Sequence, residues 1–161
     1  MNGNYKKNYF YFAFITLIFV ADRVTKIIIL NIFKTSDFAS IKINSFLNFS
    51  LVWNDGIAFG LFSLEKNFSY NILTSIIILI AIYIIFLAYK SSNLLEKLSY
   101  LMIAGGASGN IFDRLYYTSV VDFIDITINN FHWFIFNVAD IFITLGIVIL
   151  LIREFLNKKY E

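Results

Sequence analysis

Four long apolar stretches dominate the chain, and they cover residues 9–33, 68–89, 98–114 and 131–152. A helix needs roughly 20 apolar residues to cross a bilayer, and each stretch approaches or meets that length. The second stretch is free of charge, whereas the first carries Asp22, Arg23 and Lys26 and the third is short and rich in glycine. The pattern predicts a membrane protein of mainly α-helical class, with four transmembrane helices in a single domain over residues 1–161.

Two segments between these stretches, residues 34–67 and 115–134, are expected outside the membrane. Within them, residues 41–62 and 116–128 contain alternating apolar positions and many aromatic and β-branched side chains. That pattern is typical of short strands bounded by turns. Because both segments are too apolar for free loops, they predict a small external β-rich segment that lies on the membrane surface.

The composition and the placement of charge support this interpretation. Hydrophobic residues make up 59% of the chain and charged residues only 15%, which does not suit the surface of a soluble protein. Basic residues gather on one side of the predicted membrane, at Lys6, Lys7, Lys90, Lys97, Arg153, Lys158 and Lys159. Basic residues favour the cytoplasmic side, so both ends of the chain are predicted in the cytoplasm. The net charge of +2 therefore reflects topology and gives no case for a nucleic-acid partner.

Residue types that are rare or absent exclude several kinds of site. The chain has no cysteine, which excludes disulfides, thiolate metal sites and a cysteine nucleophile. Its single histidine cannot make the usual histidine-rich zinc site, so no metal and no other cofactor is expected. The N-terminal stretch resembles a signal peptide, but Ala21-Asp22-Arg23 follows it in place of a cleavage site, so an uncleaved first helix is predicted.

Asp140 is the most informative residue, because it is the only charge within residues 131–152. A carboxylate at membrane depth costs roughly 2.5–3.5 kcal/mol on insertion scales. This cost favours the interpretation that Asp140 is a functional group and faces protein or water. A structural hydrogen bond to a neighbouring helix is the alternative. Asp122 and Asp125 lie upstream, and two carboxylates that meet in a water-poor place can share a proton. On a strand these two would face opposite sides, and periodicity does not choose between them.

Further polar residues share helical faces with the candidate acids. Asn137, Asp140 and Thr144 have the spacing of one face, and Asp22 and Lys26 have that of an ion pair. A second predicted face carries Gly106, Asn110, Asp113 and Tyr117, with Arg114 adjacent. The glycines of residues 105–109 form a pattern of small residues that lets helices approach closely, and packing is expected to be most of their role.

Three other functions compete with an aspartyl dyad. A serine protease would use Ser108 and His132, but His132 is predicted at the outer membrane edge and four spans are too few for the rhomboid type. A proton-coupled transporter would use Asp22 and Asp140 as relay carboxylates, although the acids gather toward one membrane face and no repeat divides the chain. A purely structural subunit would not require so many polar residues at the ends of spans.

Five ordered blocks carry a resemblance to a known family: Asp22-Arg23-x-x-Lys26, Asn54-x-Gly56-x-Ala58-Phe59, Gly105-Gly106-Ala107-x-Gly109-Asn110-x-x-Asp113-Arg114, Val120-Val121-Asp122-Phe123 and Phe136-Asn137-x-Ala139-Asp140. Together they resemble the lipoprotein signal peptidase (signal peptidase II) family of bacterial intramembrane aspartyl proteases. The resemblance implies that Asp122 and Asp140 are the catalytic pair. It implicates Asn54, Gly56, Asn110, Arg114 and Asn137 as groups that line the site, and Asp22 and Lys26 as supporting residues.

The same resemblance implies the substrate and the location. The substrate would be a bacterial prolipoprotein whose cysteine already carries diacylglycerol, cut just before that cysteine. The protein would be a monomer in the bacterial cytoplasmic (inner) membrane, in contact with membrane lipids, with its active site toward the outer face. Residues 47–60, which are rich in aromatics, could act as a lid over the site. Interfacial anchoring by those aromatics is an equal alternative.

Overall fold

The computed structural model describes residues 2–35, 40–56, 68–128 and 131–158, and the side chains of 9–35, 40–56, 70–128 and 131–157. Within these residues the chain forms helices and strands in the order α1 (Asn2–Thr35), β1 (Ile41–Lys42), β2 (Leu47–Asn54), α2 (Phe68–Lys90), α3 (Leu94–Tyr117), β3 (Val120–Ile128), β4 (Phe131–Phe136) and α4 (Val138–Lys158). The expected mainly helical fold with a small sheet is confirmed.

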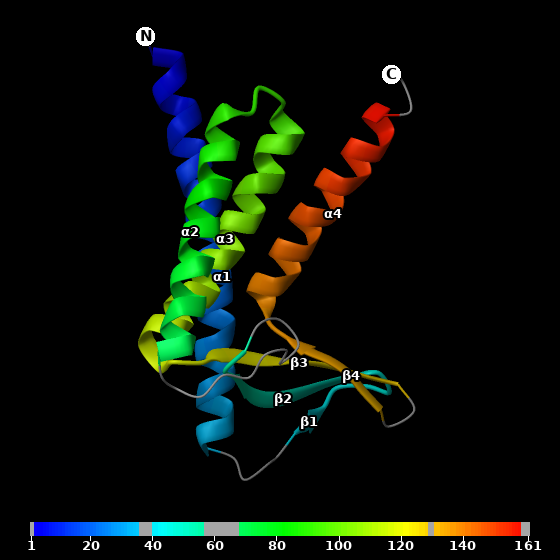
Figure 1. The fold of residues 1–161 in the computed structure, drawn as a ribbon. Helices are drawn as coiled ribbons and strands as arrows, with labels where there is room; N and C mark the ends of the chain where they lie inside the picture. The colour runs from blue at the N-terminus through cyan, green and yellow to red at the C-terminus, as the bar shows by residue number, and fades with distance from the viewer. Residues whose placement is uncertain (1, 36–39, 57–67, 129–130, 159–161) are drawn as a thin grey trace.

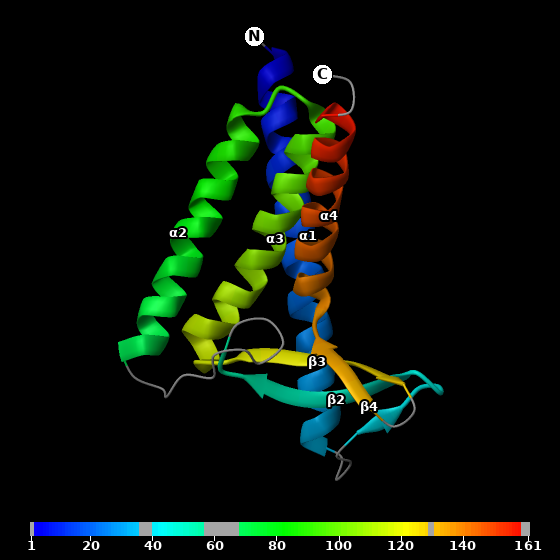
Figure 2. The ribbon, with the colours of Figure 1, turned by 45° about the vertical axis from the view of Figure 1, so that its right-hand side comes forward.

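The helices run alongside one another, and the sheet lies across one end of α2, α3 and α4, while the last turns of α1 extend past it (Figures 1 and 2). Helix α3 packs against each of the other three, and α1 also packs against α4. Helix α1 begins and α4 ends at the end of the bundle opposite the sheet, where α2 and α3 are joined (Figure 1). The fold therefore has a sheet end, which carries most of the polar contacts described below, and an opposite end.

Glycines on α3 let its neighbours approach closely, as the small-residue pattern predicted. A Cβ atom at Gly106 would overlap the backbone of Ala139 on α4, and one at Gly109 would overlap the carboxylate of Asp22 on α1. These two contacts bring α1 and α4 against the same stretch of α3. They also set the distance from α3 to Asp22 and to Ala139, the residue before Asp140.

The sheet is antiparallel, in the order β1-β2-β3-β4. Strand β3 pairs with β2, where Asp122 lies opposite Val52, and with β4, where Asp125 lies opposite Ile135. Helix α3 is capped by Thr118, whose φ of 58° is in the left-handed region and turns the chain toward β3. This turn folds β3 back over the last turn of α3.

Large apolar side chains cover the outside of the bundle. On α2, for example, Leu79 is 65% and Ile82 is 59% exposed, as is typical of residues that face lipid. By length and composition alone, one described helix, Tyr70–Lys90, is able to cross a membrane. Helix α1 contains Asp22, Arg23 and Lys26, which lower its mean hydropathy. Four transmembrane passages therefore stay a prediction.

Several predicted boundaries are wrong. Residues 131–136, taken as the start of the fourth helix, form strand β4, and α4 begins only at Val138. A continuous apolar run does not distinguish a buried strand from a helix, and the aromatic content of 131–136 was the better guide. Helix α3 extends beyond 98–114 at both ends. Residues 47–54 of the suggested lid are strand β2, which is paired on both edges, and residues 57–60 lie outside the described residues.

Candidate active site

Asp140 lies in the first turn of α4, where it and Asn137 cap the helix reciprocally. Oδ1 of Asn137 accepts a hydrogen bond from the backbone N–H of Asp140 at 3.0 Å, and Oδ2 of Asp140 accepts one from the backbone N–H of Asn137 at 3.1 Å. This is the arrangement of a capping box, which satisfies free N–H groups at a helix start. The spacing Asn-x-x-Asp was the sequence signal for this helix start, and the prediction of one helix over residues 131–152 missed it.

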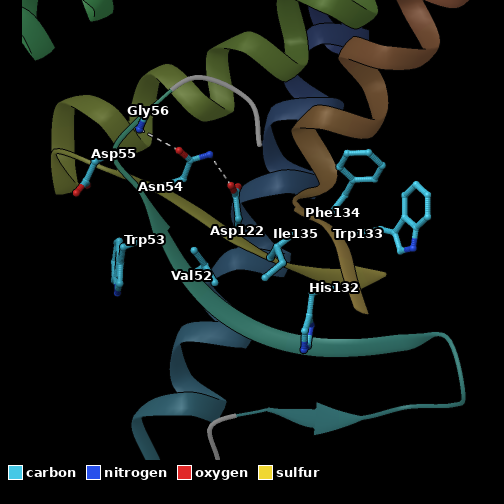
Figure 3. Close-up of a pocket in the computed structure, with 10 residues that line it drawn as sticks. All are labelled: Val52, Trp53, Asn54, Asp55, Gly56, Asp122, His132, Trp133, Phe134 and Ile135. Carbon is cyan, nitrogen blue, oxygen red and sulfur yellow. Dashed lines mark hydrogen bonds between the residues drawn. The ribbon is translucent and has the colours of Figure 1, made fainter. Parts of the chain in front are cut away.

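Asp122 projects from β3 and is only 3% exposed. Its Oδ2 accepts a hydrogen bond from Nδ2 of Asn54 at 2.8 Å, and its Oδ1 accepts one from Nδ2 of Asn137 at 2.6 Å. Asn54 comes from the end of β2, and Figure 3 shows its contact with Asp122. Asn137 directly precedes α4, so β2, β3 and the start of α4 meet at this carboxylate. Because Asn137 contacts both Asp122 and Asp140, the structure brings the two predicted acids together.

Asn110 on α3 provides a second link in this network. Its Nδ2 donates to Oδ1 of Asp140 at 2.8 Å. Its Oδ1 accepts from Nζ of Lys26 at 2.9 Å and from Nδ2 of Asn137 at 3.1 Å. Since donors face its oxygen and a carboxylate faces its nitrogen, the amide has one favourable orientation.

The surroundings of Asp122 favour a proton on its carboxyl group. Burial raises the pKa of Asp122, and the negative charge of Asp140 raises it further, to about 7. The hydrogen bonds from Asn54 and Asn137 lower the pKa and offset only part of this shift. A buried carboxylate and a half-buried one, both held by neutral amides, can therefore keep one proton between them near neutral pH.

Arg114 and Gly56 support the site from one step away. The guanidinium of Arg114 donates Nη2 to the carbonyl oxygen of Gly56, and the N–H of Gly56 donates to Oδ1 of Asn54 at 2.9 Å. Asn54 in turn donates to Asp122. Among the described residues, Arg114 thus acts on the dyad through the turn after β2 and makes no direct hydrogen bond with Asp122 or Asp140.

The remaining predicted residues, Asp22 and Lys26, form the expected ion pair, with 2.9 Å between Lys26 Nζ and Asp22 Oδ2. Lys26 Nζ also lies 2.7 Å from Oδ2 of Asp113, and Arg23 pairs with the other oxygen of Asp113. Arg23 was not among the predicted site residues, and Asp113 was a further candidate acid for which Arg114 and the end of the helix offered a structural role. The Asp-Arg pairs that interrupt the apolar stretches at 22–23 and 113–114 were the available signal.

Asp125 lies on the other face of β3 and takes no part in this network. Its carboxylate accepts hydrogen bonds from the hydroxyls of Ser50 at 2.9 Å and Thr127 at 3.2 Å, and it lies 2.7 Å from Nδ1 of His132. These contacts join β2, β3 and β4. The structure therefore separates the two acids that periodicity left equal.

Ser108 and His132 are far from the arrangement that a serine protease needs. The hydroxyl of Ser108 donates to the carbonyl oxygen of Gly105, and the residue lines an apolar pocket between α2 and α3. His132 instead pairs with Asp125 on the sheet. This alternative is contradicted.

Each candidate acid opens onto its own pocket. Asp122 lies at a pocket of about 320 Å³ between β2 and β4, lined in addition by Val52, Trp53, Asn54, Asp55, Gly56, His132, Trp133, Phe134 and Ile135 (Figure 3). Asp140 lies at a more apolar pocket of about 290 Å³ along α4, lined in addition by Phe134, Phe136, Ile141, Thr144 and Leu145. The site is thus accessible both from the sheet and from the side of the bundle.

Comparisons with known proteins agree along most of the chain. A family model described as Signal peptidase (SPase) II matches residues 14–156. The chain is 48% identical over 158 residues to a lipoprotein signal peptidase of Pelagibacter ubique (strain HTCC1062), covering 97% of this chain and 95% of that protein. It is 38% identical over 152 residues to a lipoprotein signal peptidase of Francisella tularensis subsp. novicida (strain U112), covering 92% and 93%.

The fold has a solved counterpart as well. A structure described as a bacterial membrane enzyme, determined by the in meso method at 2.3 Å resolution, superposes with a TM-score of 0.80. It is 28% identical and covers 94% of this chain and 90% of its own. The likeness therefore extends over both the helices and the sheet.

Proposed function

The chain belongs to the signal peptidase II family, a family of bacterial membrane proteases of the aspartic type, and on this premise we propose that it removes signal peptides from bacterial prolipoproteins with Asp122 and Asp140 as its catalytic pair. The substrate would carry diacylglycerol on a cysteine, and the cut would fall just before that cysteine. The observation that carries this proposal is the meeting of two carboxylates on one residue, Asn137, whose side-chain amide donates to Asp122 and whose backbone N–H donates to Asp140.

The proposed reaction is direct hydrolysis, without a covalent intermediate. The ionised aspartate removes a proton from a water molecule, whose oxygen attacks the scissile carbonyl carbon. The protonated aspartate donates a hydrogen bond to the carbonyl oxygen, where negative charge develops. When the intermediate collapses, the C–N bond breaks and the leaving amine takes up a proton from the dyad, which returns to its starting state with one proton. The raised pKa of Asp122 supports a pair that holds one proton at neutral pH.

The amides around the dyad would hold its geometry through the reaction. Asn54, Asn110 and Asn137 donate to the carboxylates, and an amide neither gains nor loses charge near neutral pH. The dyad alone would then handle the proton. The apolar pocket along α4 beside Asp140 supports a substrate that carries apolar chains, and the pocket beside Asp122 supports a peptide segment outside the membrane.

The proposal places the protein across the membrane four times, as one integral domain with α1 to α4 as its spans. The exposed apolar side chains and the position of the sheet at one end of the bundle support this arrangement (Figure 2). The basic residues support a cytoplasmic location for the start of α1 and the end of α4. The sheet and the dyad would then face the outer side, where exported prolipoproteins are processed.

Cleavage of one prolipoprotein prepared with and without diacylglycerol on its cysteine tests the substrate. The purified protein should cut the modified form far faster, and the Asp140→Asn variant should cut neither. Equal rates for the two forms would contradict a substrate class defined by the lipid. Cleavage by the Asp140→Asn variant would contradict the proposed dyad.

Single cysteines test the orientation, since the chain has none of its own. Ser45 and Ser92 are both exposed, the first near β2 and the second in the connection from α2 to α3. In intact cells a membrane-impermeant thiol reagent should label Ser45→Cys and spare Ser92→Cys. The reverse labelling would place the dyad toward the cytoplasm and contradict a role at the outer face.

A further inference from the structure

Four charged side chains lie buried together behind the dyad, between α1 and α3. Asp22, Lys26 and Asp113 are fully buried, and Arg23 is 8% exposed. Two positive and two negative charges balance. Lys26 Nζ lies 2.9 Å from Asp22 and 2.7 Å from Asp113, and Arg23 completes the set through its ion pair with Asp113.

Each carboxylate of this cluster also accepts a hydrogen bond from the backbone next to a candidate catalytic residue. Asp22 Oδ1 accepts from the N–H of Ala139 at 3.0 Å. Asp113 Oδ2 accepts from the N–H of Val121 at 3.1 Å. Ala139 directly precedes Asp140 in the sequence, and Val121 directly precedes Asp122.

We propose that the cluster of Asp22, Arg23, Lys26 and Asp113 is a clamp that sets the spacing of Asp122 and Asp140. Asp22 holds the start of α4 and Asp113 holds the start of β3. Lys26 holds both carboxylates with one ammonium group and also fixes the amide of Asn110 against Asp140. Asp113 and Arg23 thereby become positioning residues. This inference rests on the proposed function, because it assumes that the two aspartates act as a pair.

The energetics of buried ions favour this interpretation over packing alone. Removing charges from water is costly, and apolar side chains of similar volume often pack two helices equally well or better. Helices α1 and α3 already have a close apolar contact, where Gly105 faces Ile18. Apolar side chains could not accept hydrogen bonds from the N–H groups of Ala139 and Val121, and so could not hold these groups at a defined distance. A clamp gives the cluster a role that packing does not.

A pair of glycine substitutions tests the clamp without changing any charge. A methyl group at Gly109 would push the Asp22 carboxylate away, whereas one at Gly105 would press on Ile18 in the same interface of α1 and α3. Because a misplacement of about 1 Å can cost roughly a hundredfold in rate, Gly109→Ala should lower kcat by about tenfold to a hundredfold with little change in KM. Gly105→Ala, the matched control, should change kcat far less. Equal losses in both variants would overturn the clamp.

The pH dependence of kcat/KM separates positioning from packing. If the carboxylates of Asp122 and Asp140 move apart, the charge of Asp140 raises the pKa of Asp122 less. The alkaline limit, the pH above which activity declines, should therefore shift to lower pH in Gly109→Ala. A packing defect would reduce the amount of folded protein and leave that limit in place, and this result would also overturn the clamp. Asp122→Asn is measured in the same assay, since activity in that variant would contradict the proposed function and not the clamp alone.

Asp113→Asn covers the case in which Gly109→Ala does not fold. The amide is nearly isosteric but loses the attraction to Lys26 and Arg23, so kcat and the alkaline limit should fall together. Its control is Glu96→Gln, which breaks the ion pair of Glu96 with Arg153 at the opposite end of the bundle. That pair also joins α3 to another helix, yet kcat should stay close to its original value. A loss of kcat in Asp113→Asn without a shift in the limit would overturn the clamp.

Discussion

The two faces of strand β3 carry one aspartate each, and the comparison between them separates burial from chemistry. Asp122 is 3% and Asp125 is 0% exposed, so the two carboxylates are equally removed from water. Asp125 is surrounded by the hydroxyls of Ser50 and Thr127 and by the imidazole of His132. Those partners fix it as a structural link between strands.

Asp122 has neutral amide partners and a second carboxylate nearby. Asn54 and Asn137 donate to it, while the charge of Asp140 opposes its ionisation. Because it is buried near a like charge, Asp122 can hold a proton near neutral pH and share it with Asp140. Between two equally buried carboxylates, the set of partners thus distinguishes the one suited to acid–base chemistry from the one that holds a sheet together.

The largest expected effect comes from removing each acid in turn. Asp122→Asn or Asp140→Asn should lower cleavage by at least about 10²–10⁴-fold, because an amide cannot exchange the proton that general acid–base catalysis requires. Asp125→Asn should retain most of the activity. Initial cleavage rates of purified, folded variants measure this difference. An inactive Asp125→Asn with an active Asp122→Asn would reverse the assignment of the two faces.

The next effect concerns Asn137, the residue that contacts both acids. Asn137→Ala removes the donor to Asp122 and the cap of α4, so kcat should fall by roughly a hundredfold and the free energy of unfolding by about 1 kcal/mol. Asn48→Ala is the control on the opposite face, where Asn48 donates to Thr127 at 2.9 Å. It should leave kcat nearly unchanged. Similar kcat values for the two variants would show that Asn137 only caps the helix.

The pH dependence of cleavage should reflect the raised pKa of Asp122. A carboxyl group with a raised pKa keeps its proton below that pKa and loses it as the pH increases, so activity should decline above about pH 7. The hydrogen bond from Asn54 lowers this pKa. In the Asn54→Ala variant the decline should therefore move to higher pH. A profile of kcat/KM from pH 5 to 9 measures both limits, and an unchanged alkaline limit in the variant would argue against Asp122 as its source.

The smallest expected effect comes from the Asp125 face. Thr127→Val keeps the shape of the side chain and removes one hydroxyl, so the free energy of unfolding should fall by about 1 kcal/mol. The cleavage rate of the folded protein should stay the same, because Thr127 contacts Asn48, Asp125 and His132 and neither acid of the dyad. Thermal unfolding in detergent, read beside the cleavage rate, tests this. A large loss of rate without a loss of stability would contradict the separation of the two faces.

Local sequence patterns determined much of this protein. The apolar stretches predicted the helices, and the alternating segments predicted strands in residues 41–62 and 116–128, where β1, β2 and β3 lie. The spacing of Asp22 and Lys26 predicted their ion pair. Such features depend on neighbours within a few positions, and the side-chain periods of helices and strands make them readable. The family resemblance, carried by five ordered blocks, selected Asp122 and Asp140.

Only the tertiary structure decided how those residues meet. Alternation along β3 puts Asp122 and Asp125 on opposite faces, but which face meets the start of α4 depends on how the sheet packs across the bundle. Strand β4 was hidden in an apolar run, because a strand and a helix can both bury such a sequence. The hydrogen bond from Ala139 to Asp22 joins α4 to α1, which are remote in the sequence. The hydrogen bond from Val121 to Asp113 forms because β3 folds back on α3. Contacts of this kind arise from the packing of whole elements, and no local pattern encodes them.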